Sequence, residues 1–144
     1  MDADAEGRLL ALLGAHRWAA LATLGRNGPE ASWVAYALEP GGGVLLHLSR
    51  LAAHTRNLLR EPRASLAVSE PERPGHDPQQ LARVTLFGQV APIPREAAQY
   101  PVLRQCYLAR LPEAEPLFGF GDFHLFLLLP ERARFVGGFA QAHT

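Results

Sequence analysis

The stretch from Val44 to Ser69 restricts the fold more than any other part of the sequence, because two strand-like runs enclose a polar turn and a short helix. Val44 to Leu48 is an apolar run of strand length, and Ala64 to Val68 has the same character. Between them, Ser49 offers a hydroxyl where the backbone changes from extended to helical, and Pro62 disfavours helical geometry in the residue before it. The pattern predicts a strand, a helix that begins at Ser49, and a second strand.

The start of this helix is suited to binding an anion. Backbone N–H groups at a helix start have no helical acceptors, and the helix dipole adds partial positive charge. A phosphate near Ser49 and Thr55 would therefore be stabilised. Further donors are available on Arg50, His54, Arg56 and Asn57. An ordinary capped helix between two strands is the alternative interpretation of the same residues.

Length and charge restrict the class of protein and its partners. The 144 residues suit one domain, spanning 1–144, and the formal net charge of zero argues against a surface for nucleic acid. No apolar run approaches the roughly 20 residues needed to cross a bilayer, so no membrane partner is expected. The opening MDADAEGRLL lacks the basic and apolar regions of a signal peptide, which predicts a cytoplasmic location.

Several enzyme classes lose support from residues and motifs that are missing. Cys106 is the only cysteine, so neither an intrachain disulfide nor a cysteine metal cluster is expected. The chain contains no lysine, which removes a Schiff base to pyridoxal phosphate and the lysine of a phosphate-binding P-loop. The patterns G-x-S-x-G and HExxH are absent, and the six histidines show no close ligand spacing. These absences leave the catalytic residues unknown and predict no metal site of the usual kind.

The remaining segments predict a small antiparallel barrel. A short helix is expected over residues 3–15, and the Asn27-Gly28 pair predicts a hairpin between two strands. The predicted strands cover Trp18–Leu24, Ala31–Leu38, Val44–Leu48, Ala64–Val68, Leu81–Ile93, Asp122–Leu129 and Arg134–Phe139, with a turn at Pro130-Glu131. Residues 70–80 read as an exposed loop, and 94–111 as a helix that Pro101 splits or kinks. The predicted fold class is mainly β with short helices (α+β), an antiparallel barrel of six to seven strands.

In the order of its segments the chain resembles the pyridoxamine 5'-phosphate oxidase-like flavoproteins, which share an FMN-binding split β-barrel. The segments that carry the resemblance are LATLGRNGPEASWVAYAL, VLLHLSRLAAHTRNLLREPRASLAV, ARVTLFGQV and GDFHLFLLLPERARFVGGFAQA. The last of these looks most like the branch of the family associated with haem utilisation. The terminal VGGFAQAHT lacks the tryptophan-containing segment that binds the vitamin B6 substrate in the true oxidases. Oxidation of vitamin B6 is therefore disfavoured.

The resemblance implies a homodimer with FMN at the subunit interface. Carried over by position, Ser49, His54, Thr55 and Asn57 would surround the FMN phosphate. The backbone of Ser32, Trp33 and Val34 would face the flavin ring, and Arg83 would reach the phosphate or the flavin oxygens. Plainer interpretations are core packing for Trp33, a helix surface for Thr55 and a surface ion pair for Arg83.

The leading functional hypothesis is an FMN-dependent oxidoreductase acting on an unidentified small molecule, with the flavin supplying the chemistry. Two alternatives are kept. One is haem binding or haem degradation, with His124 and His143 as candidate iron ligands. The other is a flavin-binding module without turnover.

Overall fold

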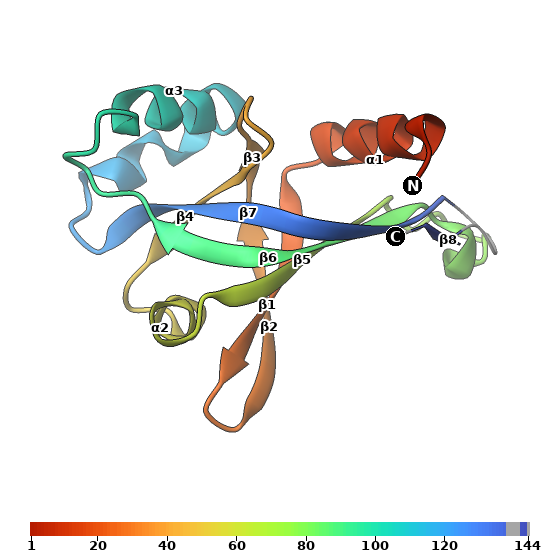
Figure 1. Ribbon diagram of the computed structural model, residues 1–144, viewed down its shortest axis with the longest axis horizontal. Helices are drawn as coiled ribbons and strands as arrows, with labels where there is room; N and C mark the ends of the chain where they lie inside the picture. Colours follow the sequence, from red (N-terminus) through yellow and green to blue (C-terminus); the bar gives the residue numbers. More distant parts are fainter. Residues whose placement is uncertain (138–141, 144) are drawn as a thin grey trace.

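A computed structural model describes residues 1–137 and 142–143 and shows one curled antiparallel sheet with helices packed around it (Figure 1). Seven strands follow one another in the order β2-β1-β5-β6-β7-β4-β3, and the short β8 pairs with β7. The strands are β1 (Trp18–Gly25), β2 (Gly28–Ala35), β3 (Ala37–Leu38), β4 (Val44–Ser49), β5 (Arg63–Ser69), β6 (Arg83–Pro92), β7 (Phe123–Val136) and β8 (Ala142–His143). The predicted split barrel and its fold class are confirmed.

Within the described residues, five helical segments lie around the sheet. They are α1 (Ala3–Ala15), α2 (Ala53–Arg60) and α3 (Tyr100–Arg110), with the 3-10 segments η1 (Pro78–Gln80) and η2 (Pro112–Gly119). Asp2 caps α1 by accepting a hydrogen bond from the Ala5 amide at 2.8 Å. No helix among the described residues has the length and apolar character to span a membrane.

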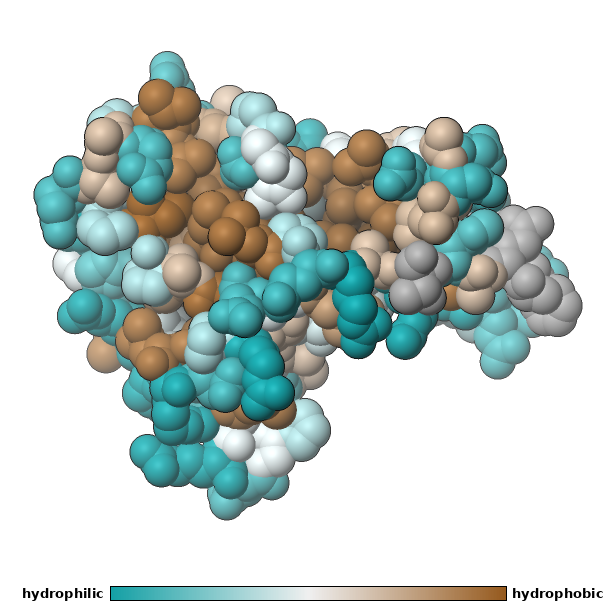
Figure 2. All heavy atoms as spheres, in the orientation of Figure 1, coloured by the Kyte–Doolittle hydropathy of each residue, from teal (hydrophilic) through white to brown (hydrophobic). Residues whose placement is uncertain are grey.

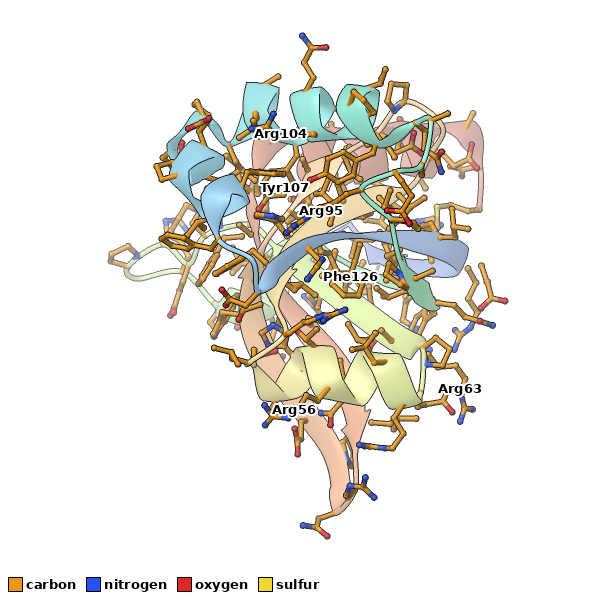
Figure 3. The ribbon with its side chains drawn as sticks, turned by 90° about the vertical axis from the view of Figure 1, so that its left-hand side faces the viewer. Arg56, Arg63, Arg95, Arg104, Tyr107 and Phe126 are labelled. Carbon is orange, nitrogen blue, oxygen red and sulfur yellow. The ribbon has the colours of Figure 1, made fainter. Side chains whose placement is uncertain are left out.

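Two hydrophobic cores lie on opposite sides of β4 and β7. The main core fills the inside of the curled sheet and includes Leu21, Leu46, Leu66 and Phe126, each at most 2% exposed. The second core lies between the outer side of these strands and the pair α3 and η2. It consists of Ala37, Leu45, Ile93, Tyr107, Leu111, Ala114 and Leu125. Figure 3 shows Tyr107 and Phe126 on the two sides of the sheet. Because β4 is covered on both faces, its sequence reads as a continuous apolar run.

The prediction of a helix beginning at Ser49 is wrong. The helix α2 begins at Ala53, with Ala52 in the cap position and no side-chain cap. The Ser49 hydroxyl instead donates to the Asp122 carboxylate at 2.7 Å and accepts from the Leu51 amide at 3.1 Å. Local sequence rules assign the Ser49 side chain to the helix start, but in the structure it bonds to Asp122, 73 positions away in the chain.

The prediction of two strands around Pro130-Glu131 is also wrong, because β7 runs unbroken past both residues. The pairing register between β6 and β7 shifts between Phe87 and Gly88, so the extra residue is absorbed as a bulge. A side chain at Gly88 would collide with the carbonyl of Leu129. The predicted strand end at Phe139 lies outside the described residues.

Other boundaries differ in smaller ways. The predicted strand Ala31–Leu38 divides into β2 and β3 at Tyr36, whose amide donates to the Arg17 carbonyl at 2.9 Å. The predicted helix over 94–111 is shorter, and Pro101 lies in its first turn, where a missing N–H costs nothing. The hairpin at Asn27-Gly28 is confirmed, with Gly28 at φ +132°.

Candidate functional site

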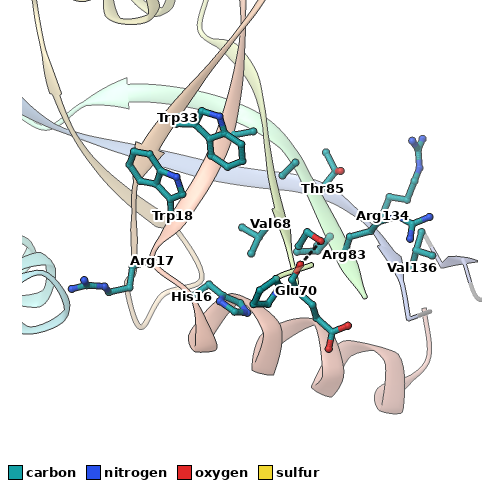
Figure 4. Close-up of a pocket in the computed structure, with 15 residues that line it drawn as sticks. His16, Arg17, Trp18, Trp33, Val68, Glu70, Arg83, Thr85, Arg134 and Val136 are labelled. Carbon is teal, nitrogen blue, oxygen red and sulfur yellow. Dashed lines mark hydrogen bonds between the residues drawn. The ribbon is translucent and has the colours of Figure 1, made fainter. Parts of the chain in front are cut away.

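A pocket of about 660 Å³ lies on the outer face of the sheet, where β1, β2, β5, β6 and β7 present their outward residues (Figure 4). We call it the outer-face pocket. It is lined by His16, Arg17, Trp18, Ala20, Trp33, Ala67, Val68, Ser69, Glu70, Pro71, Arg83, Val84, Thr85, Arg134 and Val136. Its volume falls within the range of small-molecule sites.

A stacked pair of tryptophans forms one wall of this pocket. Trp18 of β1 pairs with Ala35, and Trp33 of β2 pairs with Ala20, so the two indoles are diagonal neighbours on the outer face. Their ring centroids are 5.9 Å apart with 10° between the planes. The two residues are 58% and 62% exposed. Two large aromatic side chains exposed side by side in a pocket mark a surface for an apolar partner. The core-packing interpretation of Trp33 is wrong.

Two arginines lie on the opposite side of the pocket. Arg83 and Arg134 are exposed on the neighbouring strands β6 and β7. The Arg83 guanidinium donates to the backbone carbonyls of Gln79 and Leu81, at 3.0 and 2.9 Å, and Arg134 lies 5.4 Å from the centre of the Phe87 ring. Neither arginine makes an ion pair with a carboxylate among the described residues. The site can therefore attract an anionic group.

The other charged residues of the lining are already engaged. Arg17 points away from the pocket (Figure 4) and forms an ion pair with Glu113 at 2.6 Å. The Glu70 carboxylate accepts a hydrogen bond from the Ala82 amide at 2.7 Å. His16 also lines the pocket, at the junction between α1 and β1. Sequence reasoning missed His16, because nothing in the local pattern connects a residue after a helix with a surface of the sheet.

In the bend after β4, where we expected a phosphate, two backbone amides already donate to protein carbonyls. The Arg50 amide donates to the Asp122 carbonyl at 2.7 Å, and the Ala52 amide donates to the Ser49 carbonyl at 3.1 Å. The Leu51 amide donates to the Ser49 hydroxyl, so the amides of residues 50–52 all have protein acceptors, whereas the start of α2 at Ala53 has no side-chain cap. Asp122 also places a carboxylate beside Ser49.

The other residues that we predicted to bind a phosphate lie in different surroundings. Thr55 is fully buried, so the helix-surface interpretation is wrong, and its hydroxyl has no hydrogen-bond partner within the described part of the chain. The buried Asn57 amide donates to Thr23 at 3.1 Å and to Glu30 at 2.8 Å, which ties α2 to the β1–β2 hairpin. His54 is half-buried, and burial lowers its pKa. The assignment of these residues to an FMN phosphate stays a prediction.

Of the predicted flavin-ring residues, Trp33 alone has its side chain in the outer-face pocket. Val34 is 5% exposed and belongs to the main core, and the Ser32 hydroxyl is buried without a partner among the described residues. The structure thus brings together Trp33 and Arg83, and it places Ser49, His54, Thr55 and Asn57 outside the pocket lining.

Residues 11–144 match the CREG β-barrel family. The chain belongs to this family. It is 33% identical to a haem-binding protein from Mycobacterium smegmatis, covering 99% of this chain and 58% of that one, with a TM-score of 0.88. It is also 33% identical to the chloroplastic non-canonical haem oxygenase HOZ of Arabidopsis thaliana, over 79% of this chain and 33% of that protein. The chain therefore spans about a third of this curated relative and just over half of the mycobacterial chain.

This CREG-family chain also shares its fold with a putative pyridoxamine 5'-phosphate oxidase from Listeria innocua. The TM-score is 0.67 at 18% identity, covering 92% of this chain and 98% of that one. This likeness concerns the fold alone. It confirms the resemblance of the CREG-family chain to the pyridoxamine 5'-phosphate oxidase-like split barrel.

The two histidines expected as haem ligands in this CREG-family barrel are far from equivalent. His124 pairs with Leu48, and its Nε2 atom is buried without a partner among residues 1–137 and 142–143. Burial, together with Arg50 and Arg95, lowers the His124 pKa. His143 of β8 lies 6.2 Å from the buried Phe135 ring. Neither residue lines the outer-face pocket.

His47 is the most buried histidine of this CREG-family barrel among the described residues. It is 8% exposed and stacks on Phe118 of η2, with the ring centroids 3.8 Å apart. Burial, followed by the charges of Arg95, His124 and Arg104, lowers the His47 pKa to about 4. The described residues contain no group of three or more His, Cys, Asp or Glu side chains that could hold a metal ion.

Proposed function

We propose that this chain binds haem in the outer-face pocket. The observation that carries the proposal is the stacked, exposed pair Trp18 and Trp33, facing Arg83 and Arg134 across one pocket. Haem combines a flat apolar ring with two carboxylates, and this pocket combines an aromatic wall with two cationic groups. The residues present therefore fit the chemistry of the group.

Each part of the pocket has a role in this proposal. The indoles supply a large apolar surface for the ring, and aromatic stacking adds to the free energy of simple burial. Arginine binds carboxylates through two parallel hydrogen bonds, so Arg83 and Arg134 would pair with the propionates. Haem, when bound, supplies an iron centre whose reactivity depends on its axial ligand and surroundings.

The relatives support haem over FMN. Two proteins that are each 33% identical to this chain are named for haem binding and for haem oxygenase activity. Haem degradation by this chain is a more specific proposal than haem binding. It stays a proposal because the chain spans only part of each relative. The hypothesis of an FMN oxidoreductase has weaker support, since Asp122 places a carboxylate beside Ser49 in the bend expected to hold the phosphate, and the Arg50, Leu51 and Ala52 amides there already donate to protein acceptors.

Titration of the purified chain with ferric haem tests the proposal. We expect a saturable Soret band, and the double variant Trp18→Ala/Trp33→Ala should weaken binding by roughly tenfold or more, since each indole buries apolar surface worth more than 1 kcal/mol. Phe120→Ala is the matched control, because Phe120 is a 52% exposed aromatic outside the pocket. Failure of the wild-type chain to take up haem, or equal binding by the double variant, would contradict the proposal. A parallel titration with FMN tests the competing cofactor.

A further measurement distinguishes haem degradation from haem binding. Loss of the Soret band on incubation with a reductant and oxygen would show haem degradation, whereas a stable band would show haem binding without degradation.

We also propose that the chain forms a homodimer, because the exposed Trp18 and Trp33 suit an interface that closes over a cofactor. Light scattering coupled to size-exclusion chromatography measures the oligomeric state, and a monomer at micromolar concentration would oppose this proposal.

A further inference from the structure

The structure assigns His16 as the axial ligand of the haem iron, an inference that rests on the proposed function. The side chains that ligate haem iron in proteins are His, Cys, Met and Tyr. His16 is the only residue of these four types among those that line the outer-face pocket. It lies on the same side of the pocket as Glu70, below the tryptophan pair (Figure 4).

The backbone around His16 is held by hydrogen bonds from two other elements. The Arg110 guanidinium of α3 donates to the carbonyls of Gly14 and His16, at 2.6 and 3.3 Å. Tyr36 contributes two more bonds, from its amide to the Arg17 carbonyl at 2.9 Å and from its hydroxyl to the Leu13 carbonyl at 2.6 Å. Tyr36 is 1% exposed, so this anchor is part of the main core. A ligand on a rigid junction is positioned before its metal arrives.

The imidazole of His16 is at the same time uncommitted. It is half-buried and makes no hydrogen bond or ring contact with any residue in the described ranges. His47 differs because it is buried and stacks on Phe118 of η2. His124 is half-buried like His16, but it does not line the outer-face pocket. An imidazole nitrogen without a protein partner at the wall of the pocket is available to ligate haem iron.

His143 is the competing ligand. It belongs to β8, which pairs with the end of β7, and Val136 at that end lines the pocket. His143 itself packs against Phe135, on the side of β7 that carries the main core. The geometry therefore favours His16 over His143.

The test compares the ferric haem complexes of the wild type, His16→Ala, His143→Ala and the control His76→Ala, which changes an exposed loop histidine. The readouts are the Soret and visible bands, the electron paramagnetic resonance spectrum and the dissociation constant. We expect His16→Ala alone to change the ligand spectrum and to weaken binding by roughly tenfold. Added imidazole should restore the wild-type spectrum in that variant, because it can occupy the space of the missing side chain.

The outcomes separate the two levels of the proposal. Absence of haem uptake by the wild type would overturn the proposed function. Haem uptake with an unchanged ligand spectrum in His16→Ala, or a loss of the wild-type spectrum only in His143→Ala, would overturn the assignment of His16 while leaving haem binding intact. Circular dichroism of each apoprotein confirms that the variants are folded before haem is added.

Discussion

The outer-face pocket and the second core are built from the same kinds of side chain, yet they use them in opposite ways. Under α3 and η2, the His47 ring stacks on Phe118 and lies 5.7 Å from the Tyr107 ring, so imidazole and aromatic rings cover one another, and the buried His47 Nδ1 has no hydrogen-bond partner among the described residues. In the outer-face pocket, Trp18 and Trp33 stack with more than half of their surface left exposed by the described residues. The first arrangement stabilises the fold, and the second offers a surface to a ligand.

The surface of the molecule reflects this division. In the view of Figure 2, apolar residues gather around α3 and part of α1, whereas hydrophilic residues predominate at the tip of the β1–β2 hairpin. The tryptophan pair lies on strands, where strand alternation places Trp33 outward between the inward Ser32 and Val34.

Replacing one aromatic residue in each region gives the largest expected difference. Tyr107→Ala should lower the free energy of unfolding by roughly 3 kcal/mol, because it leaves a cavity in the second core. Trp33→Ala should change it by less than about 1 kcal/mol, because the indole is mostly exposed. Urea unfolding measures both values, and haem affinity should respond in the reverse order. Equal losses of stability would show that the two regions do not differ in this way.

Acid should weaken the second core in particular. The folded chain holds the His47 pKa at about 4, below its ordinary value of 6.5, so between these values the unfolded chain binds more protons. Stability from this group is therefore complete above pH 6.5, falls as the pH decreases toward 4, and changes no further below it. Between pH 7.5 and pH 5 the wild-type chain should lose about 2 kcal/mol of folding stability through His47, and the His47→Gln variant should not show this loss. His76→Gln, in the exposed loop, is the control, and the same pH dependence in both variants would exclude His47 as the cause.

The cationic side of the pocket should affect binding without affecting the fold. Arg83→Gln and Arg134→Gln should each weaken haem binding about fivefold, which corresponds to about 1 kcal/mol for one exposed, charge-assisted contact. The loss should shrink at high salt, because exposed charges are screened. Arg63→Gln is a suitable control, since Arg63 is exposed and pairs with Glu61 outside the pocket. Affinities that are independent of salt would argue against propionate binding at these arginines.

The smallest effect concerns the connection between the two regions. Arg110 belongs to α3, which covers the second core, and its guanidinium holds the junction that carries His16. Arg110→Met should lower stability by about 1 kcal/mol, because it removes two exposed hydrogen bonds, and should broaden the ligand spectrum of the haem complex. Electron paramagnetic resonance detects such heterogeneity. A sharp wild-type spectrum in Arg110→Met would show that Tyr36 alone positions the junction.

Local patterns predicted those elements that depend on neighbouring residues in the sequence. The hairpin at Asn27-Gly28 follows from turn chemistry, and the apolar run of β4 follows from burial on both faces. The predictions failed where a distant partner decides the structure. Asp122 takes the hydroxyl of Ser49 away from the helix start, and the bulge at Gly88 lets β7 continue through Pro130, which we interpreted as a turn.

The candidate site was predictable only in part for the same reason. The family resemblance pointed to Trp33 and Arg83, which the sheet brings into one pocket although 50 positions separate them. Trp18 and His16 were not predicted as site residues, because their role depends on the antiparallel register of β1 and β2 and on the position of α1 beside the sheet. A cross-strand pairing of two tryptophans can be found in a sequence once the hairpin register is known.

The strand β2 lies at one edge of the sheet, so one row of its backbone hydrogen-bonding groups has no neighbouring strand in the described chain. Such an edge can recruit a strand from another molecule and start aggregation. Pro29 has no N–H to offer, and Glu30 adds an exposed negative charge next to it. These two residues discourage uncontrolled strand addition, so the barrel can keep its apolar indoles accessible and still avoid polymerising through the adjacent edge.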